Sequence, residues 1–409
     1  KCYNNAIEIE PKYLAAYNNL GILLKKTGKL LDASKCFISS INLNSENPLI
    51  HFQLGSTFYK LKKFKDAEFC YIKTLSLNEN YVEAYIALAF TYRELQKLDA
   101  AEINSRKAIE LKKDYAEAHY SLSLVLNDLY VLNENKIILN EAEESSKRAI
   151  NLKPNYIEAY LSLAIILQNK GNINDAEDSY KKALKINPDN ELIKSNYKIL
   201  LKQKELLSIL NIKTDNWVSN KIIDDKNKFL IDHNLISYPL IFNREVESEL
   251  VSQLYKISSS ELNETKGGPL YGKGKTSDYN LFDDNSLIIK KVKSDITKII
   301  IEAVKSDIYI IDSFFNILGS GGGSIPHNHI NNFDKINNLF NQKYSLTYYL
   351  DVGDQTSNNP GIFKTYKPDK EILPSKGMIM IIPATRNHSA IYEGKTDRVM
   401  IGINFYSIS

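Results

Sequence analysis

Three of the six histidines lie beyond residue 300, at spacings that suit a metal site. His327 and His329 are separated by one residue, and side chains two apart in an extended segment project to the same side. His388 follows the apolar run MIMIIPA and the short turn TRN, so a sheet could bring it beside the pair. Imidazole is a ligand for iron, zinc, copper or nickel. The sequence therefore predicts a metal centre of His327, His329 and His388. The alternative is a polar loop at the pair and a turn cap at His388.

Arg398, ten residues after His388, is a candidate for binding an acid. Strand alternation in RVMIGINF puts this arginine on the same face as Met400, Gly402 and Asn404, and puts Val399, Ile401, Ile403 and Phe405 on the other face. A buried arginine needs an anionic partner, and a carboxylate can bind it in bidentate fashion. The alternative is a surface ion pair between Arg398 and Asp397 or Glu393.

A second strand with a polar face supports the same interpretation. In YSLTYYL, alternation groups Ser345 and Thr347 with Tyr349, against an apolar face of Tyr344, Leu346, Tyr348 and Leu350. Two strands that each turn polar groups inward are typical of a barrel that holds a small polar ligand.

The segments around these residues predict an antiparallel β domain preceded by helices. Amphipathic helices are expected at 243–257 and 285–306, and strands at 308–318, 343–353, 377–384 and 397–408. The glycine-rich run GSGGGS at 319–324 is interpreted as a turn that lets the histidine pair reach the predicted metal centre.

The first half of the chain has a 34-residue period. One series of small residues is Gly21, Gly55, Ala89, Ser123 and Ala164, and a second is Ala33, Ala67, Ala101, Ala142 and Ala176. Both series contain one step of 41, which places a seven-residue insertion near YVLNENK. Small residues at these positions let the two helices of a hairpin approach closely. The apolar segment near ELIKSNYKILLKQKELLSIL is expected to cap the array.

Two further series follow the same period. The cysteines Cys2, Cys36 and Cys70 are one repeat position seen three times, which favours free buried thiols over a metal site. Tyr17, Tyr85 and Tyr160 recur in first helices of hairpins. They either pack between hairpins or form an aromatic ladder that binds an extended peptide, for example a proline-rich one.

The repeat pattern resembles the tetratricopeptide repeat, which implies an all-α superhelix whose groove holds a protein or peptide partner. The net charge of +3 and the absence of an apolar run of about 18 residues argue against nucleic-acid and membrane partners. A cytoplasmic location is expected, and the oligomeric state is left open. Residue 1 is Lys, so we expect a fragment or a processed chain.

The C-terminal motifs resemble the 2-oxoglutarate- and iron(II)-dependent dioxygenases, particularly the prolyl-hydroxylase-like branch. That resemblance implies a double-stranded β-helix of the jelly-roll or cupin type. It also implies iron ligation by His327 and His388, binding of the co-substrate 2-oxoglutarate by Arg398 and Tyr349, and possible use of ascorbate. PGIF at 360–363 resembles a strand start in that branch.

The sequence departs from the family pattern at one ligand. The family motif His-x-Asp is His327-Asn-His329 here, so an imidazole replaces the carboxylate. Asp334 is the alternative carboxylate ligand if its loop folds back.

The sequence thus predicts a multidomain chain: repeats with a capping helix at 1–204, a linker at 205–235, and a dioxygenase-like α+β domain at 236–409. The favoured function is a repeat-guided dioxygenase that hydroxylates a protein or peptide side chain. A non-catalytic interaction scaffold with a degenerate oxygenase fold is the alternative. A third possibility is a cupin-like metal enzyme that does not use 2-oxoglutarate.

Overall fold

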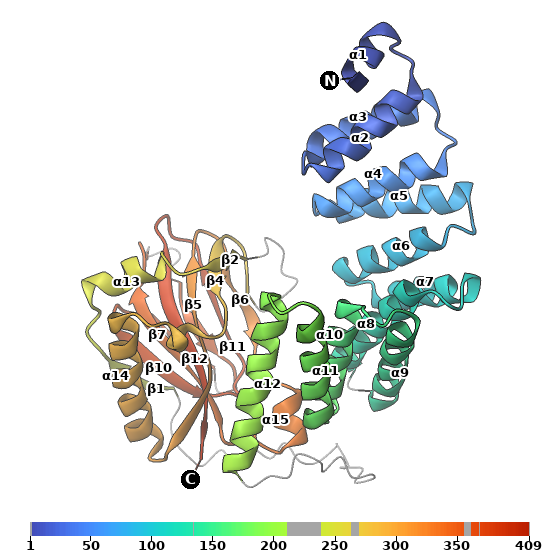
Figure 1. Cartoon of the computed structure of the whole chain (residues 1–409). Helices are drawn as coiled ribbons and strands as arrows, with labels where there is room; N and C mark the ends of the chain where they lie inside the picture. The colour runs from blue at the N-terminus through green and yellow to red at the C-terminus, as the bar shows by residue number, and fades with distance from the viewer. Residues whose placement is uncertain are drawn as a thin grey trace. The chain divides into compact units, whose positions relative to one another are not determined.

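The computed structural model describes residues 2–133, 135–210, 239–262, 270–355, 361–367 and 369–408. It divides into two compact units (Figure 1). The first contains Lys1–Lys170 and Asp178–Asp189, and the second contains Gly171–Glu177 and Asn190–Ser409. None of the described helices is both long and apolar enough to cross a bilayer.

Consecutive helices pack in pairs through the first unit. In chain order they are α1 Cys2–Ile9, α2 Leu14–Lys26, α3 Leu30–Leu43, α4 Pro48–Lys60, α5 Phe64–Leu77, α6 Val82–Glu94, α7 Leu98–Leu111, α8 Ala116–Asn133, α9 Lys136–Leu152, α10 Ile157–Asn169 and α11 Ile173–Ile186. The small-residue series has the predicted packing role. A Cβ on Gly21 would lie 2.7 Å from the Phe37 ring, and one on Gly55 would lie 2.8 Å from the Tyr71 ring. All five alanines of the second series are fully buried.

The seven-residue insertion lengthens one hairpin. Helix α8 has 18 residues and α9 has 17, whereas α6 and α7 have 13 and 14. The extra residues therefore continue helices instead of forming a separate loop. The cysteines differ from the prediction of buried thiols: Cys70 is buried, Cys36 is half-buried and Cys2 is exposed.

Helix α12, Glu191–Ile209, which we predicted to cap the repeats, is part of the second unit and bonds to Glu177 of α11 through Tyr197 and Lys204. It packs on β5, where Tyr309 donates a 2.6 Å hydrogen bond to Glu205, and Lys198 pairs with Asp283 at 2.6 Å. The helix ends four residues after the predicted start of the linker at 205. The rest of that predicted linker, from 211 onward, lies outside the described residues.

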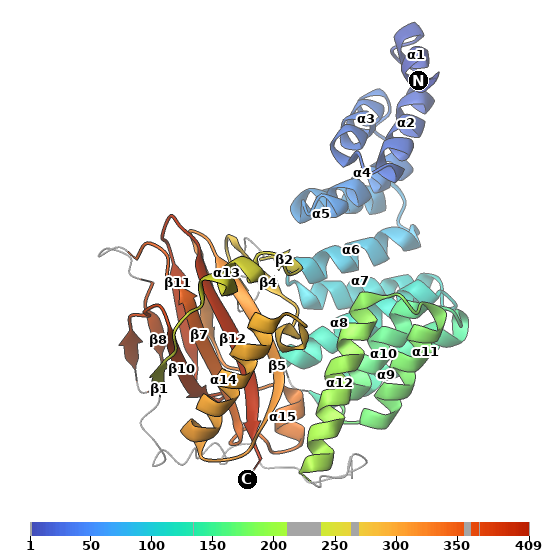
Figure 2. The same ribbon diagram turned by 60° about the vertical axis from the view of Figure 1, so that its left-hand side comes forward.

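Two antiparallel sheets form the centre of the second unit (Figure 2). The larger has the strand order β1-β10-β7-β12-β5-β4-β2 and the smaller has β3-β6-β11-β8-β9. The strands are β1 Leu240–Asn243, β2 Ser259–Glu261, β3 Leu270–Tyr271, β4 Gly274–Ser277, β5 Ile308–Leu318, β6 Gly322–His327, β7 Lys343–Asp351, β8 Phe363–Thr365, β9 Lys370–Ile372, β10 Met378–Pro383, β11 His388–Tyr392 and β12 Arg398–Ser407. The predicted strands correspond to β5, β7, β10 and β12.

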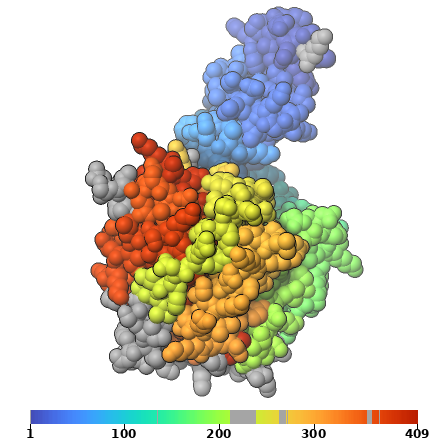
Figure 3. Space-filling model, turned by 90° about the vertical axis from the view of Figure 1, so that its left-hand side faces the viewer, coloured from blue at the N-terminus to red at the C-terminus, as the bar shows by residue number. Residues whose placement is uncertain are grey.

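Helices cover the outer face of the larger sheet. They are α13 Ser248–Leu254 and α14 Leu287–Val304, next to a short 3-10 helix, η1, at Leu281–Asp283, and Figure 3 views the molecule from this side. The helical spacing of Ile289, Val292, Ile296 and Ile300 gives α14 one buried face. This face packs on Val399, Ile401, Ile403 and Phe405 of β12 and on Leu346, Tyr348 and Leu350 of β7. The predicted alternation of both strands is thereby confirmed.

The opposite, inner face of the larger sheet packs against the smaller sheet. A second apolar cluster joins Leu318, Tyr349, Met380, Ile382 and Met400 of the larger sheet to Phe363 and Tyr392 of the smaller one. The chain after β6 contains one short helix, α15, at Asn332–Ile336. The space between the sheets is where the predicted polar residues face inward.

Candidate metal and anion site

The smaller sheet brings two of the three histidines together. His327 is the last residue of β6 and His388 is the first of β11, and the two are paired across antiparallel strands. His329 lies two residues after the end of β6, where its amide donates a 2.9 Å hydrogen bond to the carbonyl of Ala384. The three imidazoles therefore come from one strand pair and the segment that follows it.

The rings lie close enough to share one ion. The Nε2 atoms of His329 and His388 are 3.3 Å apart. Ring centroids are separated by 4.5 Å for His327 and His388, 5.0 Å for His329 and His388, and 5.1 Å for His327 and His329. One ligand atom from each residue lies within 4.8 Å of the others. Among the described residues this is the group of histidine, cysteine and acidic side chains that satisfies the distances of a metal site.

Backbone carbonyls set the tautomer of two of these histidines. Nδ1 of His327 lies 2.8 Å from the carbonyl oxygen of Ile325, and Nδ1 of His388 lies 3.2 Å from that of Arg386. A carbonyl only accepts, so each Nδ1 must carry the proton. The Nε2 lone pair of each ring is then directed to the centre of the cluster, which is the arrangement that metal-binding histidines use.

Burial keeps the cluster uncharged. It lowers the pKa of His327, lowers that of His388 to about 4, and lowers that of His329 well below its usual value, with the neighbouring imidazoles adding to the effect for the last two. Phe363 stacks on His388 with a centroid distance of 5.2 Å and contributes to this dry environment. Neutral imidazoles keep a lone pair available for a cation.

Arg398 is fully buried without a carboxylate partner among the described residues. Its Nη1 donates a 2.8 Å hydrogen bond to the carbonyl of Gly361, and its guanidinium lies 4.5 Å from the centre of the Tyr392 ring. Across the ranges that the structure describes, its Nε and Nη2 have no hydrogen-bond partner. Burial lowers its pKa. The alternative of a surface ion pair is wrong, because Arg398 is 0% exposed and Asp397 instead accepts a 2.6 Å hydrogen bond from Tyr255.

Gly361 is required for this placement of the arginine. Its φ of +62° lies in the left-handed region, and a Cβ here would lie 2.1 Å from Nη2 of Arg398. Tyr349 completes this end of the interior. It is buried, its ring centre is 5.9 Å from the guanidinium, and burial raises its pKa. Within the described part of the chain, its hydroxyl makes no hydrogen bond. Arg398 and Tyr349 thus offer donors to an incoming group.

Asp334 does not serve as the alternative ligand that we considered. Its Oδ2 is 2.8 Å from Nζ of Lys343 and accepts a 2.8 Å hydrogen bond from the Asn331 amide, while its Oδ1 accepts from the Tyr406 hydroxyl. The carboxylate is 0% exposed and caps α15. It is therefore the counterion of a buried lysine, and the cluster that could hold an ion consists of the three imidazoles.

The repeat tyrosines have mainly packing environments. Tyr85 packs against Ala108 and Ala118, and Tyr17 and Tyr160 are half-buried. Ring contacts between repeats come from other positions: Phe52 with Tyr81 at 5.0 Å, Phe90 with Tyr120 at 6.1 Å, and Tyr120 with Tyr156 at 5.1 Å. Sequence reasoning missed these contacts although Phe52 and Tyr120 share one repeat position and Tyr81 and Tyr156 another, because each ring meets a partner at a different repeat position.

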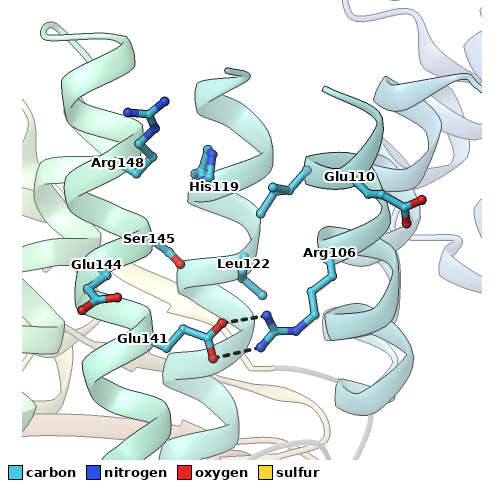
Figure 4. A pocket seen from close by; sticks show the side chains of 9 residues that line it. Arg106, Glu110, His119, Leu122, Glu141, Glu144, Ser145 and Arg148 are labelled. Atoms are coloured by element: carbon cyan, nitrogen blue, oxygen red, sulfur yellow. Dashed lines mark hydrogen bonds and ion pairs between the residues drawn. The ribbon is translucent and has the colours of Figure 1, made fainter. Parts of the chain in front are cut away.

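A hollow of about 470 Å³ on the repeats is lined by α7, α8 and α9 (Figure 4). Both of its arginines are paired: Arg106 forms two hydrogen bonds with Glu141, at 2.6 and 2.9 Å, and Arg148 pairs with Asp114, which lies outside the lining, at 2.5 Å. His119 lies 2.8 Å through Nε2 from the carbonyl of Lys113. A second hollow, of about 500 Å³, is lined by Tyr160 and by residues of α11. Neither contains an unpaired buried charge like that of Arg398.

Comparison with known proteins identifies the repeats. Models described as tetratricopeptide repeat match residues 2–33, 49–81, 82–115 and 157–190. The N-terminal part of the chain is therefore a tetratricopeptide-repeat array, as predicted. A search of curated proteins found no match.

Solved structures of repeat proteins are similar over part of the chain. YrrB, a repeat protein with an unusual peptide-binding site, is 20% identical, with 48% of this chain and 98% of that chain covered and a TM-score of 0.37. TTC0263, a repeat protein of Thermus thermophilus, is 23% identical, with 46% and 98% covered and a TM-score of 0.40. The first repeat domain of Spaghetti (RPAP3), bound to an HSP90 peptide, is 27% identical, with 28% and 92% covered and a TM-score of 0.28.

Proposed function

We propose that the chain is a 2-oxoglutarate- and iron(II)-dependent dioxygenase that hydroxylates a side chain of a protein or peptide held by its repeats. The interaction role of the repeats follows from the matched family models. The dioxygenase part is supported by one combination: three imidazoles that share a dry centre, and a buried guanidinium with two unpartnered nitrogens in the same two-sheet interior. This interior is consistent with a double-stranded β-helix.

The residues fit such a metal and co-substrate. Imidazole nitrogen is a suitable ligand for iron(II), and the two carbonyl-bound Nδ1 atoms leave two Nε2 atoms directed inward. The unpartnered Nε and Nη2 of Arg398 match the two oxygens of a carboxylate. Phe363 connects the histidine cluster to the arginine, because it stacks on His388 and lies two residues from Gly361, whose carbonyl bonds to Arg398.

Each group has a separate task in this proposal. Iron(II), when bound together with 2-oxoglutarate and O2, supplies the oxidising chemistry. The three histidines hold the ion, Arg398 binds the distal carboxylate of 2-oxoglutarate, and the Tyr349 hydroxyl donates to the same co-substrate. The apolar side chains around Met380, Ile382 and Met400 exclude water from the reaction. The repeats would select the polypeptide.

A test compares His388→Ala with His119→Ala, the same change in an exposed part of the repeats. We expect His388→Ala to lower affinity for manganese(II), a substitute for iron(II), by at least about 100-fold and to abolish succinate release, whereas His119→Ala should change neither. Succinate release that persists in His388→Ala would contradict the proposal.

The scaffold alternative predicts a different set of results. His329 in place of a carboxylate is the observation that favours it. A scaffold would bind its polypeptide partner with neither manganese(II) nor 2-oxoglutarate affecting the interaction. A metal enzyme that does not use 2-oxoglutarate would bind the ion and be insensitive to Arg398→Met. For the array itself, the double change Tyr85→Ala and Tyr160→Ala should weaken partner binding if these rings form a ladder, and should unfold the repeats if they only pack.

A further inference from the structure

A second polar group lies on the inner face of the larger sheet, away from Arg398. Antiparallel pairing of β5 with β12 sets Asp312 opposite Asn404, Phe314 opposite Gly402, and Asn316 opposite Met400. Asp312, Phe314 and Asn316 alternate along β5 and so share its inward face. The three side chains form a row with an aromatic ring between two polar ends.

Phe314 forms the floor of this row because Gly402 has no side chain. A Cβ at Gly402 would lie 2.4 Å from Cζ of Phe314, so the ring rests directly on the β12 backbone. Tyr279 meets the same ring edge-on, with a centroid distance of 5.2 Å. An aromatic floor of this kind can accept the methylene groups and the charge of a basic side chain.

The polar ends present acceptors that lack donors. Asn404 donates through Nδ2 to Oδ1 of Asp312 at 2.8 Å, which fixes the orientation of its amide. Its own Oδ1 and the Oδ1 of Asn316 have no hydrogen-bond partner among the residues that the structure describes, although these residues are only 6% and 4% exposed. Buried acceptors without donors cost free energy, so their presence calls for a ligand that donates.

Asp312 also lacks a counterion of its own in the described residues. The nearest basic groups already have partners: Lys343 pairs with Asp334 at 2.8 Å, and Lys202 bonds to Asn280 at 3.3 Å and lies 3.8 Å from Asp283. Burial raises the pKa of Asp312 to about 6, against the lowering effects of Lys343, Asn404 and Lys202. Near neutral pH the side chain is therefore an ionised carboxylate, and its negative charge is only partly balanced by the neighbouring basic groups.

We propose that Asp312 and Asn404 form a subsite for the cationic end of a basic side chain, lysine in particular, on the polypeptide that enters the two-sheet interior. An ammonium group brings three donors and one positive charge, which matches the unpartnered amide oxygen of Asn404 and the Asp312 carboxylate. Asn316, four residues along β5 at about 3.3 Å per residue, is too far from Asp312 to share the same ammonium group. The assignment of this ligand to a substrate rests on the proposed function. The binding site itself rests only on these side chains.

The test measures binding of three short probes by calorimetry: acetyl-Gly-X-Gly-amide with X as lysine, norleucine or glutamate. We expect the wild type to bind the lysine probe at least about tenfold more tightly than the norleucine probe. Asp312→Asn should abolish this preference. Asp307→Asn, the same change at an exposed residue just before β5, should retain it.

Equal affinity for the lysine and norleucine probes in the wild type, or a preference that survives Asp312→Asn, would overturn the subsite. If Asp312→Asn does not fold, Asn404→Leu replaces it and should reduce the preference. Manganese(II) and 2-oxoglutarate binding are measured on the same samples. Loss of the lysine preference alone refutes the subsite, whereas failure to bind both manganese(II) and 2-oxoglutarate refutes the proposed function and leaves the subsite standing.

Discussion

Replacing Arg398 by methionine should leave the ligand-free protein as stable as the wild type, or more stable. Two of its nitrogens are buried without partners, at a cost of about 1–3 kcal/mol each. Against this stand one hydrogen bond to Gly361 and ring contacts with Tyr392 and Tyr349, of about 0.5–2 kcal/mol each. The terms nearly cancel, so the expected change is within about 2 kcal/mol of zero.

Arg244→Met is the matched control. This arginine is also buried, but its guanidinium pairs with Glu247 and Asp295, at 2.6 and 2.8 Å, and with the Tyr348 hydroxyl at 3.0 Å. Removing it leaves Asp295 without this partner and Glu247 with Lys291 alone, at 3.1 Å, and because the two carboxylates are 37% and 20% exposed the expected loss is about 3 kcal/mol. The two substitutions are chemically identical, so the difference between them measures how completely the protein itself satisfies each guanidinium.

Urea denaturation, with and without 2-oxoglutarate in the presence of manganese(II), measures both effects. At a ligand concentration 100 times its Kd, the wild type should gain about 2.7 kcal/mol, and Arg398→Met should gain almost none. A loss of 3 kcal/mol or more in ligand-free Arg398→Met would refute the reasoning, because the arginine would then be a structural residue like Arg244.

Three further changes test neighbouring parts of the interior. Lys343→Met should lower the free energy of unfolding in urea by about 3–5 kcal/mol, because it leaves the buried Asp334 carboxylate without its counterion. A loss below about 1 kcal/mol would contradict this pairing. In Gly361→Ala, the Cβ of the alanine should displace Arg398, so calorimetry should show 2-oxoglutarate affinity lowered at least about tenfold. The free energy of unfolding should fall by only about 1–2 kcal/mol. Unchanged affinity would count against the anion site. Burial raises the pKa of Asp312 from 3.8 to about 6, so the stability that its protonated form contributes is complete below pH 3.8 and is lost as the pH rises through 6. Relative to Asp312→Asn, the wild type should therefore lose up to about 3 kcal/mol between pH 4 and pH 7, and parallel pH profiles of the two proteins would disprove the shift.

Patterns that depend on local periodicity were readable in the sequence. The 34-residue series of small residues predicted the hairpins, because close helix contacts tolerate only small side chains at positions such as Gly21 and Ala33. Alternation in β12 predicted which side chains face the helices, and the i, i+2 spacing of His327 and His329 predicted that they lie together. In each case the spacing alone decides which side a residue faces.

Features that depend on contacts distant in sequence were not predicted. The run 319–324 was interpreted as a turn, but its second half is the start of β6. A Cβ at Gly323 would lie 2.4 Å from the carbonyl oxygen of Ala390, so glycine here permits close approach of β11, an effect that strand propensity does not register. Asp334 was likewise interpreted as a candidate ligand because its partner Lys343 and the bond to Tyr406 are formed only in the folded state.

The two sets of unpartnered polar atoms on the inner face could in principle have satisfied each other. Among the described residues, Arg398 has donors without acceptors, whereas Asn404 has an acceptor without a donor. Arg398 and Asn404 lie on the same face of β12 but six residues apart, which at about 3.3 Å per residue separates their backbones by roughly 20 Å. The interior therefore has a donor end and an acceptor end that the fold keeps apart. Leaving these donors and acceptors unpartnered lowers the stability of the ligand-free protein. Binding of a carboxylate at the Arg398 end and of a cationic side chain at the Asn404 end would restore the lost stability.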